Sequence, residues 1–387
     1  MKNHYYADMH VHIGRDWNQK PVKITGAKNL TLTNILIESS RNKGIDLIGV
    51  IDCHVPAVID EIKQLIHTGK ASELKEGGIQ FEEVTLILGS EIEVYDPSST
   101  GPIHVLCYLP TIEAMEFFSN WLDSNMKNIH LSTQRIYATA IELQMKIKEA
   151  GGLFIPAHIF TPFKSLYGKG VKQSMTEILD PARIDAVELG LSSDTWMADQ
   201  ISELKKYTFL TNSDAHSLGK IAREYQEIQM EKPSFTEFKR AIHGIHGRKI
   251  IRNYGMNPKL GKYYTTVCQT CYTPVPYKTI KCPSCNSNKI VQGVYDRIQE
   301  LSDAAIDRDK RPPYYYQVPL EYLPKLGPKT YEKLLDRFGT EMHVIHHASF
   351  EQLIEIIPPK LAQSIIDMRN GKLSIQAGGG GKYGKVY

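Results

Sequence analysis

Histidine and carboxylate residues stand at the ends of short apolar runs throughout the first 216 residues of this chain. The first run ends in Asp8-Met9-His10-Val11-His12, in which the two histidines lie two positions apart. At that spacing in a strand, both imidazoles point to one side and can chelate a single ion. Asp8 lies on the same face and could bind metal or orient a ligand.

The same pattern recurs at later runs. Glu91 follows an apolar run, and its carboxylate is suited to bridging two cations because each oxygen can take one. Glu93 competes for that role but lies two residues further from the run. Strand ends of this kind that converge on one face of a barrel would build a multinuclear metal site for phosphoester hydrolysis. The remaining candidate ligands are Asp52, His54, His104, His158, Asp214 and His216.

Short β-prone runs alternate with helical patterns in this part of the chain. Strand followed by helix, repeated, predicts a parallel α/β sheet, and seven repeats with polar ligands at the strand ends favour a closed barrel. An open doubly wound sheet is the alternative, although no glycine-rich phosphate loop follows any run. The strands are expected at 5–9, 47–51, 84–88, 103–109, 153–156, 186–189 and 207–211, and the helices at 32–42, 58–67, 112–126 and 133–150.

Length and charge divide the chain into unlike parts. With 387 residues, it exceeds what one compact core usually holds, so two or three domains are expected. Residues 1–216 hold 20 Lys and Arg against 27 Asp and Glu, a balance of −7, whereas residues 217–387 hold 26 against 16, a balance of +10. The basic part is expected to meet a polyanion, most simply nucleic acid, with solvated surface charge as the alternative.

The sequence contains neither a predicted membrane span nor a predicted secretory signal. No run of about eighteen apolar residues could span a membrane. The first six residues lack the apolar segment of a secretory signal. We therefore expect a cytoplasmic protein without a membrane partner. Changes in amino-acid composition and apolar periodicity predict a barrel at 1–252, a zinc ribbon at 253–310, a helical module at 317–373 and a flexible glycine-rich tail at 374–387.

Two CxxC pairs form the most specific short motif. Four thiolates at this spacing close a tetrahedral site around Zn²⁺ and leave no open position, so the ion would be structural. Cys53 and Cys107 are left over and are expected to be small packed side chains, since disulfides are rare in a reducing cytosol. The predicted zinc ligands are Cys268, Cys271, Cys282 and Cys285.

The segment Leu323–Phe338 is similar to the first half of a helix-hairpin-helix module. In that module, a hairpin with glycine offers backbone N–H groups at a helix start to a DNA phosphate, with a lysine beside it. Gly327, Lys329 and Thr330 would make these contacts. An ordinary capped helical hairpin is the alternative. The second half has proline where glycine is expected, at 357–362.

The ligand pattern of residues 1–216 resembles the polymerase and histidinol phosphatase (PHP) domain. The resemblance rests, in order, on DMHVH at 8–12, DCH at 52–54, GSEIE at 89–93, His104, PAH at 156–158 and SDAH at 213–216. It implies a distorted (β/α)7 barrel with two or three divalent ions, Zn²⁺, Mn²⁺ or Mg²⁺. It further implies one ion held by His10, His12, Glu91 and Asp214, a second by Glu91, His104 and His158, and a third by His54 with His216.

One departure from the PHP pattern affects the third ion. Many members carry another histidine a few residues after the HxH pair, where this chain has Gly14-Arg15-Asp16-Trp17-Asn18. The third site therefore has the weakest support. The residues expected to be catalytic are His10, His12, Glu91, His158, Asp214 and His216.

The order of barrel, CxxC ribbon, helical module and GGGGKYG tail at 378–384 resembles the endonuclease Q family over nearly the full length. Members of this family nick DNA on the 5′ side of deaminated bases or abasic sites. The resemblance implies double-stranded DNA with such lesions as the substrate, a nucleoid-associated location and a replication or repair clamp as a further partner.

The expected reaction is metal-assisted hydrolysis of the phosphodiester 5′ to uracil, hypoxanthine, xanthine or an abasic site, which leaves 3′-hydroxyl and 5′-phosphate ends. The damaged base is expected to leave the stack. The segment 159–170 is the candidate for contact with it, through Phe163, Lys164 and Tyr167. A histidinol-phosphatase-like enzyme for small molecules would share every barrel ligand but would not need residues 255–387. A degenerate barrel that only binds DNA is the other alternative.

Overall fold

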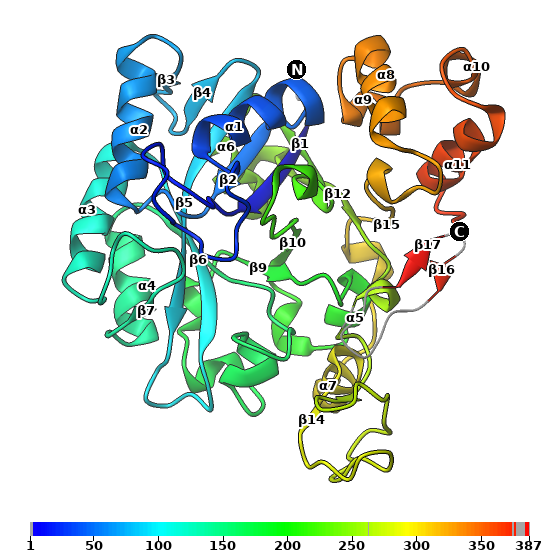
Figure 1. Ribbon diagram of the computed structural model, residues 1–387. Helices are drawn as coiled ribbons and strands as arrows, with labels where there is room; N and C mark the ends of the chain where they lie inside the picture. The colour runs from blue at the N-terminus through cyan, green and yellow to red at the C-terminus, as the bar shows by residue number, and fades with distance from the viewer. Residues whose placement is uncertain (1–2, 262, 374, 377–383, 387) are drawn as a thin grey trace.

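The computed structural model describes residues 3–261, 263–373, 375–376 and 384–386, and its N-terminal part is a distorted barrel of strands surrounded by helices (Figure 1). The α/β barrel predicted from the sequence is confirmed, and each of its expected strands is present. They are β1 (Asn3–Val11), β2 (Leu47–Val50), β5 (Val84–Val94), β6 (Ile103–Leu109), β8 (Leu153–Pro156), β9 (Ala186–Leu189) and β10 (Thr208–Thr211).

The sequence pattern predicted parallel strands throughout the barrel, and this prediction is wrong for β6. β1, β2 and β5 run parallel, but β6 is antiparallel to both β5 and β8. Only residues 95–102 connect β5 to β6, and a parallel pair would need a crossover of about a dozen residues or more. β9 and β10 pair with each other in parallel, in a separate two-stranded sheet.

The other edge of β1 extends the sheet. β11 (Tyr225–Met230) pairs antiparallel with β1, and β12 (Lys249–Gly255) pairs antiparallel with β11. β15 (Tyr314–Tyr316) then pairs in parallel with β12. The chain therefore leaves the sheet at Gly255 and returns to it at Tyr314. Short strands complete the main sheet at β3 (Ser72–Glu73), β4 (Ile79–Phe81) and β7 (Arg135–Ile136).

Helices cover the outside of the strands, with α2, α3 and α4 along one flank (Figure 1). They are α1 (Leu32–Ile37), continued by the π-helix η1 (Glu38–Lys43), α2 (Pro56–His67), α3 (Ile112–Asp123), α4 (Ala140–Glu149), α5 (Thr195–Ala198) and α6 (Phe235–Ile242). Single turns lie at η2 (Leu166–Gly170), η3 (Met175–Glu177), η4 (Pro181–Arg183), η5 (Ser202–Leu204), η6 (Leu218–Lys220) and η7 (Ile245–Gly247). Among the residues described, no helix is both long and apolar enough to cross a bilayer.

Helix α4 starts later than its apolar periodicity predicted. Thr139 caps the helix by accepting a hydrogen bond from the Glu142 backbone N–H, and the Glu142 side chain returns to the Thr139 backbone N–H. This capping box fixes the helix start. The preceding residues 135–136 form β7 beside β5. The expected helix over 133–150 is thus a short strand followed by a helix.

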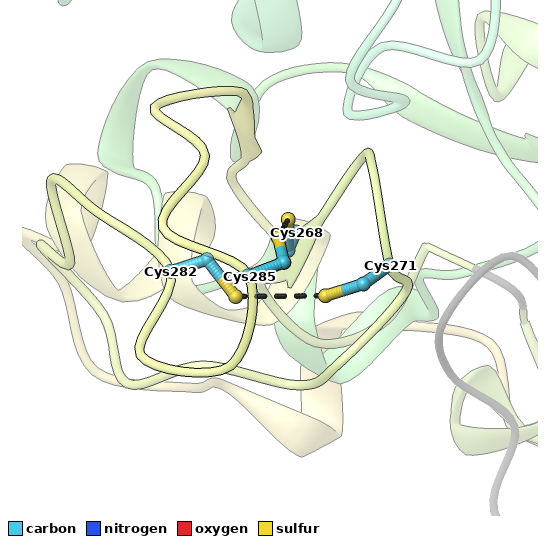
Figure 2. A group of neighbouring side chains, drawn as sticks. All are labelled: Cys268, Cys271, Cys282 and Cys285. Atoms are coloured by element: carbon cyan, nitrogen blue, oxygen red, sulfur yellow. Dashed lines mark hydrogen bonds between the residues drawn. The ribbon is translucent and has the colours of Figure 1, made fainter.

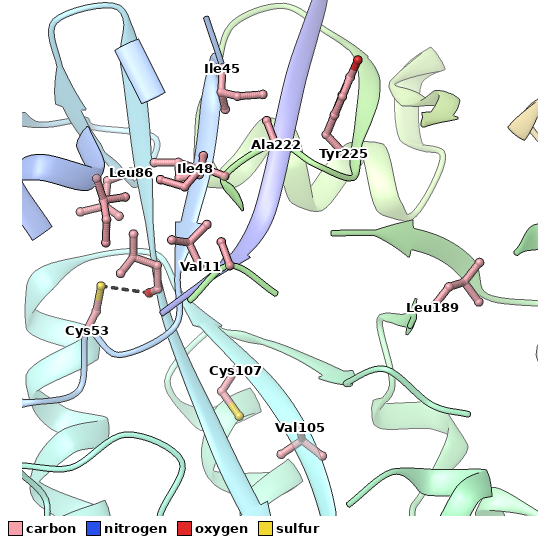
Figure 3. Packing of buried hydrophobic residues seen from close by; sticks show 14 of the residues in the cluster. Val11, Ile45, Ile48, Cys53, Leu86, Val105, Cys107, Leu189, Ala222 and Tyr225 are labelled. Carbon is pink, nitrogen blue, oxygen red and sulfur yellow. Dashed lines mark hydrogen bonds between the residues drawn. The ribbon is translucent and has the colours of Figure 1, made fainter. Parts of the chain in front are cut away.

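Aliphatic side chains of neighbouring strands form the core. Val11, Ile48 and Leu86 belong to one buried cluster, seen in Figure 3. Cys53 and Cys107 are both buried and free of disulfides, as predicted. The Cys53 thiol donates a hydrogen bond to the Val50 carbonyl at 3.1 Å. Both cysteines act as small core side chains.

The C-terminal part carries a small ribbon and a helical module. The ribbon has β13 (Val267–Cys268) paired antiparallel with β14 (Ile290–Val291). Other elements here are η8 (Pro258–Leu260), α7 (Val294–Leu301), η9 (Arg308–Lys310), η10 (Leu320–Tyr322), α8 (Pro328–Phe338), α9 (Glu341–His346), α10 (Phe350–Ile354) and α11 (Pro359–Arg369). The tail expected to be flexible lies partly outside the described residues, and its described part forms the pair β16 (Ile375–Gln376) and β17 (Lys385–Val386).

Buried polar contacts fasten the helical module to the barrel. Lys43 of η1 and Glu341 of α9 form an ion pair at 2.6 Å, with side chains only 3% and 2% exposed. The Tyr225 hydroxyl lies 2.6 Å from Nε2 of His346, whose ring stacks on Tyr6. Each contact joins a barrel residue to α9. The module is therefore held at a defined place beside the barrel.

Substituting Glu341→Gln should lower the thermal stability of the whole chain, because it leaves the Lys43 ammonium buried without its counter-charge. Breaking one side of a buried pair typically costs about 3–5 kcal/mol. Circular dichroism melts of wild type and variant would measure the shift.

The double variant Lys43→Met/Glu341→Leu should recover most of the lost stability, since it removes both charges. Glu116→Gln is the control, because Glu116 pairs with Lys63 at the surface, where both side chains are more than 40% exposed. It should cost less than about 1 kcal/mol. An unchanged melting temperature for Glu341→Gln would show that the ion pair does not stabilise the interface.

Candidate active site

The first donor group forms where β1 meets the loop after β10. His10 lies near the end of β1 and His12 is the first residue after it, with ring centroids 5.3 Å apart. Their Nε2 atoms lie 3.5 Å and 3.6 Å from Oδ1 of Asp214. Ligand atoms of these three residues all lie within 4.8 Å of one another. The structure therefore brings the predicted HxH pair and Asp214 together around one point.

The second donor group consists of Glu91, His104 and His158. Oε1 of Glu91 lies 2.9 Å from Nδ1 of His104 and 3.3 Å from Nε2 of His158. Its other oxygen, Oε2, lies 3.5 Å from Nε2 of His12 in the first group. One buried carboxylate thus faces both groups, which is the geometry expected of a bridging ligand. Its rival Glu93 pairs with Lys164 at 2.7 Å and lies 3.6 Å from Nε2 of His104.

The donors fit divalent cations. Nε2 of His10 is buried and makes no hydrogen bond, whereas Nε2 of His104 lies 3.6 Å from Oε2 of Glu93. Buried polar atoms are normally satisfied, so Nε2 of His10 is a candidate metal-binding atom. Imidazole nitrogens and carboxylate oxygens together suit Zn²⁺ and Mn²⁺, and Mg²⁺ less readily where imidazole predominates. His158 and Asp214 have positive φ angles of 30° and 48°, a strained backbone typical of functional sites.

Nearby positive charges favour the ionised form of Glu91. Burial alone would raise the pKa of Glu91, but His104 and Lys23 hold that pKa well below its usual value. Burial opposes protonation of His10, yet Glu188 and Asp214 raise the pKa of this imidazole to about 10. Burial and Lys23 lower the pKa of His12 to about 4. Binding of a cation by His10 would therefore be coupled to the loss of a proton from this imidazole.

His54 and His216, the two residues expected to hold a third ion, belong to neither donor group among the described residues. His216 lies beside the first group, with Nε2 at 3.2 Å from Oδ1 of Asp214. Nδ1 of His54 lies 2.8 Å from the Ser90 hydroxyl, and its Nε2 is buried without a partner. Oδ2 of Asp52 accepts a hydrogen bond from the Ile13 backbone at 2.7 Å and lies 3.2 Å from Nδ1 of His12. Asp52 thus orients a ligand, and Asp52 and His54 lie outside both donor groups.

Glu188 is a site residue that the sequence analysis missed. Its buried carboxylate lies 2.8 Å from Nδ1 of His10 and accepts hydrogen bonds from the Asn212 side chain and the His158 backbone N–H. It therefore supports one ligand from each donor group. The available signal was a lone carboxylate inside the apolar run of β9, a position where an unpaired charge is costly.

A cavity of about 370 Å³ opens beside the donor groups. His158, Asp214 and His216 form one side of it, and the basic side chains of Lys220 and Arg223 also line it. Cavities of this size with a few convergent polar groups are typical ligand sites. The cavity has room for a nucleotide next to the candidate metal ligands.

The expected DNA contacts fall in two places. Phe163 is 43% exposed, and its ring meets Tyr263 edge to face at a centroid distance of 5.6 Å. Lys164 is half exposed and pairs with Glu93. Tyr167 is fully buried, stacks on Phe160 and donates to Glu203, so its ring does not face solvent. Gly327 is the N-cap of α8, with Lys329 exposed and Thr330 partly exposed in its first turn.

The four predicted zinc cysteines converge in the ribbon (Figure 2). Sγ of Cys268 lies 3.5 Å from Sγ of Cys285, and Sγ of Cys271 lies 3.5 Å from Sγ of Cys282. These separations are far too long for disulfides and close to the roughly 3.8 Å edge of a tetrahedral zinc–sulfur site. The residues after the two pairs, Tyr272 and Asn286, both have positive φ. The two cysteine turns are therefore built alike.

Comparison with known proteins gives full-length matches, although no family model matches the chain. The uncharacterized protein YqxK of Bacillus subtilis is 56% identical over 98% of both chains. The uncharacterized protein MJ0043 of Methanocaldococcus jannaschii is 39% identical over 252 residues, which are 59% of this chain and 31% of that protein.

Two solved structures share the whole architecture. The lesion-specific endonuclease PfuEndoQ of Pyrococcus furiosus superposes with a TM-score of 0.85 and 31% identity, over 99% of this chain and 95% of the other. Endonuclease Q in complex with a 27-mer duplex substrate, with an abasic lesion at its active site, gives the same score and identity over 99% and 96%.

The barrel and its donor groups define a metal-dependent hydrolase of the phosphoesterase and nuclease class. Within that class, the likeness extends through the ribbon and the helical module. The chain belongs to the endonuclease Q family.

The double substitution Cys282→Ser/Cys285→Ser should remove bound zinc, because it takes away two of the four thiolates of the ribbon. Elemental analysis of purified protein would measure the metal. Wild type should carry one zinc more per chain than the variant. Cys107→Ala is the control, since this buried thiol lies in the barrel core and should leave the zinc content unchanged. Equal zinc in all three proteins would exclude a zinc site at these cysteines.

Glu188→Gln should weaken binding of Mn²⁺ to the metal-free protein by about 10- to 100-fold, the usual effect of losing a partner that orients metal ligands. Isothermal titration calorimetry would measure the affinity and the number of ions bound.

Asp185→Asn is the matched control, because Asp185 is another buried carboxylate, placed just before the opposite end of β9. It should lower thermal stability and leave Mn²⁺ affinity unchanged. If Glu188→Gln binds Mn²⁺ like wild type, Glu188 does not position the ligands.

Proposed function

We propose that this chain is a DNA repair endonuclease that cuts the phosphodiester on the 5′ side of damaged nucleotides. Its substrates would be double-stranded DNA with uracil, hypoxanthine, xanthine or an abasic site, and the products would carry 3′-hydroxyl and 5′-phosphate ends. The observation that carries the proposal is the full-length likeness to endonuclease Q, including the complex with an abasic-lesion duplex at the active site. Its action on such a substrate also implies a nucleoid-associated location.

The two donor groups would hold the ions of this reaction. When bound, divalent ions lower the pKa of water and stabilise negative charge on the leaving oxygen. His10, His12 and Asp214 serve one position, His104 and His158 serve the other, and Glu91 faces both. Lys23 lies 3.5 Å from Oε2 of Glu91 and would add positive charge near a phosphate bound at the donor groups. With this arrangement, no protein side chain is required to act as a general base.

The cavity beside the donor groups would receive the damaged nucleotide. Deaminated bases are hidden within a duplex, so an enzyme that reads them takes the nucleotide out of the stack. Lys220 and Arg223 line the cavity and would offset the charge of the flanking phosphates. Phe163 stands near its edge, in edge-to-face contact with the cavity residue Tyr263.

The helical module would hold the flanking duplex. The start of α8 presents Gly327 and Lys329 to solvent, where backbone N–H groups and an ammonium can bind phosphate. The positive balance of residues 217–387 supports this assignment, because phosphate contacts dominate affinity for DNA. The contacts of α9 with the barrel fix the distance between α8 and the donor groups.

Asp214→Asn should abolish nicking, because it replaces a charged ligand of the first donor group with a neutral amide. The assay uses end-labelled duplexes with uracil, hypoxanthine, xanthine, an abasic site or no lesion, incubated with Mg²⁺ or Mn²⁺ and separated on a denaturing gel. Wild type should cut only the damaged strands, on the 5′ side of the lesion, and only with metal.

Asp60→Asn is the control, since Asp60 is exposed on the outer helix α2 and should leave nicking intact. Duplex affinity of Asp214→Asn should stay close to that of wild type. Nicking at wild-type rate by Asp214→Asn would overturn the ligand assignment. Hydrolysis of small phosphomonoesters without any nicking of damaged DNA would instead indicate a phosphatase.

A further inference from the structure

An exposed stack of aromatic and basic side chains stands at the rim of the barrel. It consists of Tyr95, Lys127, Arg135 and Tyr137, and we refer to it as the rim stack. Cζ of Arg135 lies 4.8 Å from the ring centroid of Tyr95 and 5.4 Å from that of Tyr137. Nζ of Lys127 lies 5.9 Å from the ring centroid of Tyr137. Tyr95 is 44% exposed and Tyr137 is 55% exposed, so much of both rings faces solvent.

The backbone holds the rim stack without help from its side chains. β7 pairs in parallel with the end of β5, with Arg135 opposite Glu93 and Ile136 opposite Val94. Ile136 is buried, so Arg135 and Tyr137 on either side of it project from the opposite face. The Tyr137 backbone N–H also donates to the Asn125 carbonyl at 2.7 Å. Because the backbone and Ile136 already hold this segment in place, the two exposed tyrosine rings are not needed to anchor it.

Strand β5 connects the rim stack to the candidate metal ligands. Glu91 and Glu93 are alternate residues of β5 and lie on one face of the strand, and Tyr95 is the first residue after its end. Both carboxylates are mostly buried, whereas Tyr95 is largely exposed, so the strand emerges from the barrel along this line. At roughly 3.3 Å per residue, Tyr95 stands about 13 Å from Glu91. A strand cut at the donor groups could reach the rim stack within a few nucleotides.

The chemistry of the rim stack selects an unpaired base. Aromatic rings stack on bases only where the base faces are free, and every base offers such a face. Arginine and lysine beside the rings add attraction to phosphate and cation–π contacts with bases. Glu93, the acid paired with Arg135 across the strands, is already neutralised by Lys164 at 2.7 Å. The rim stack therefore combines two rings that are 44% and 55% exposed with two basic side chains that form no ion pair among the described residues.

We infer that the rim stack binds an unpaired nucleotide close to the lesion, by stacking its base on Tyr137 and Tyr95. The inference rests on the proposed function, because it gives a place to the DNA strand that leaves the donor groups. Removal of a nucleotide from the duplex opens the helix at that point. Single-stranded DNA with the same lesion offers more free bases, so it should depend on the rim stack more than duplex does.

The test uses oligonucleotides with a tetrahydrofuran abasic analogue and the fluorescent base 2-aminopurine at one of the three positions on either side. They are bound, single-stranded and as duplexes, to protein with Asp214→Asn added to prevent cutting. At one or more of these positions, binding should quench 2-aminopurine. Adding Tyr137→Ala should remove this quenching and weaken single-strand affinity at least about fivefold, the lower range for stacking on one aromatic ring. Tyr137→Phe should preserve both.

Phe117→Ala is the matched control. Phe117 is 42% exposed on α3 and has Lys146 over its ring at 3.8 Å, so it copies the composition of the rim stack away from the donor groups. It should change neither quenching nor affinity. Equal losses with Phe117→Ala and Tyr137→Ala, or none with Tyr137→Ala, would overturn the inference and leave a protein partner as the occupant to seek.

Nicking of uracil duplex by protein with intact Asp214 is measured in parallel and separates the two proposals. If wild type nicks the uracil duplex but Tyr137→Ala leaves single-strand binding unchanged, only the inference about the rim stack is wrong. Single-strand binding that depends on Tyr137, without nicking by wild type, supports the rim stack and defeats the proposed function. Absence of both nicking and binding defeats both.

Discussion

One buried carboxylate organises the candidate active site. Glu91 reaches His104 and His158 with one oxygen and His12 with the other, so the two donor groups share it. A negative charge at this depth is stable only among cations and hydrogen-bond donors. Lys23 supplies a positive charge and the Thr133 hydroxyl donates a hydrogen bond at Oε2 of Glu91. The geometry of the surrounding strand ends follows from the need to surround this charge.

The distortion of the barrel serves that need. Because β6 runs antiparallel to its neighbours, its first residues lie at the same end of the barrel as the last residues of β5 and β8. His104 at the start of β6 therefore meets Glu91 and His158. A parallel β6 would have placed His104 at the far end of the barrel. The change of strand direction thus completes the second donor group.

The sequence predicted most of the fold and the members of both donor groups, because both leave periodic or repeated signals. Apolar runs located the seven expected barrel strands but not β11, β12 or β15, and ligand-type residues at run ends marked the donor groups. Glu188 was missed because it stands inside an apolar run and depends on partners far away in sequence. The direction of β6 and the start of α4 depended on loop length and on the Thr139 cap, which override periodicity. Tyr167 looked available in the sequence, but the fold packs it on Phe160.

The return of the chain to the barrel sheet at β15 affects how the protein unfolds. Residues 256–313 form a long crossover whose two ends are fixed in neighbouring strands, β12 and β15. Chelation of the ribbon metal would release a closed loop rather than a free arm, and loop entropy grows only slowly with loop length. The ribbon can then open as a separate cooperative unit while the barrel sheet keeps its hydrogen bonds. Amide hydrogen exchange would report such an opening as fast exchange confined to the crossover.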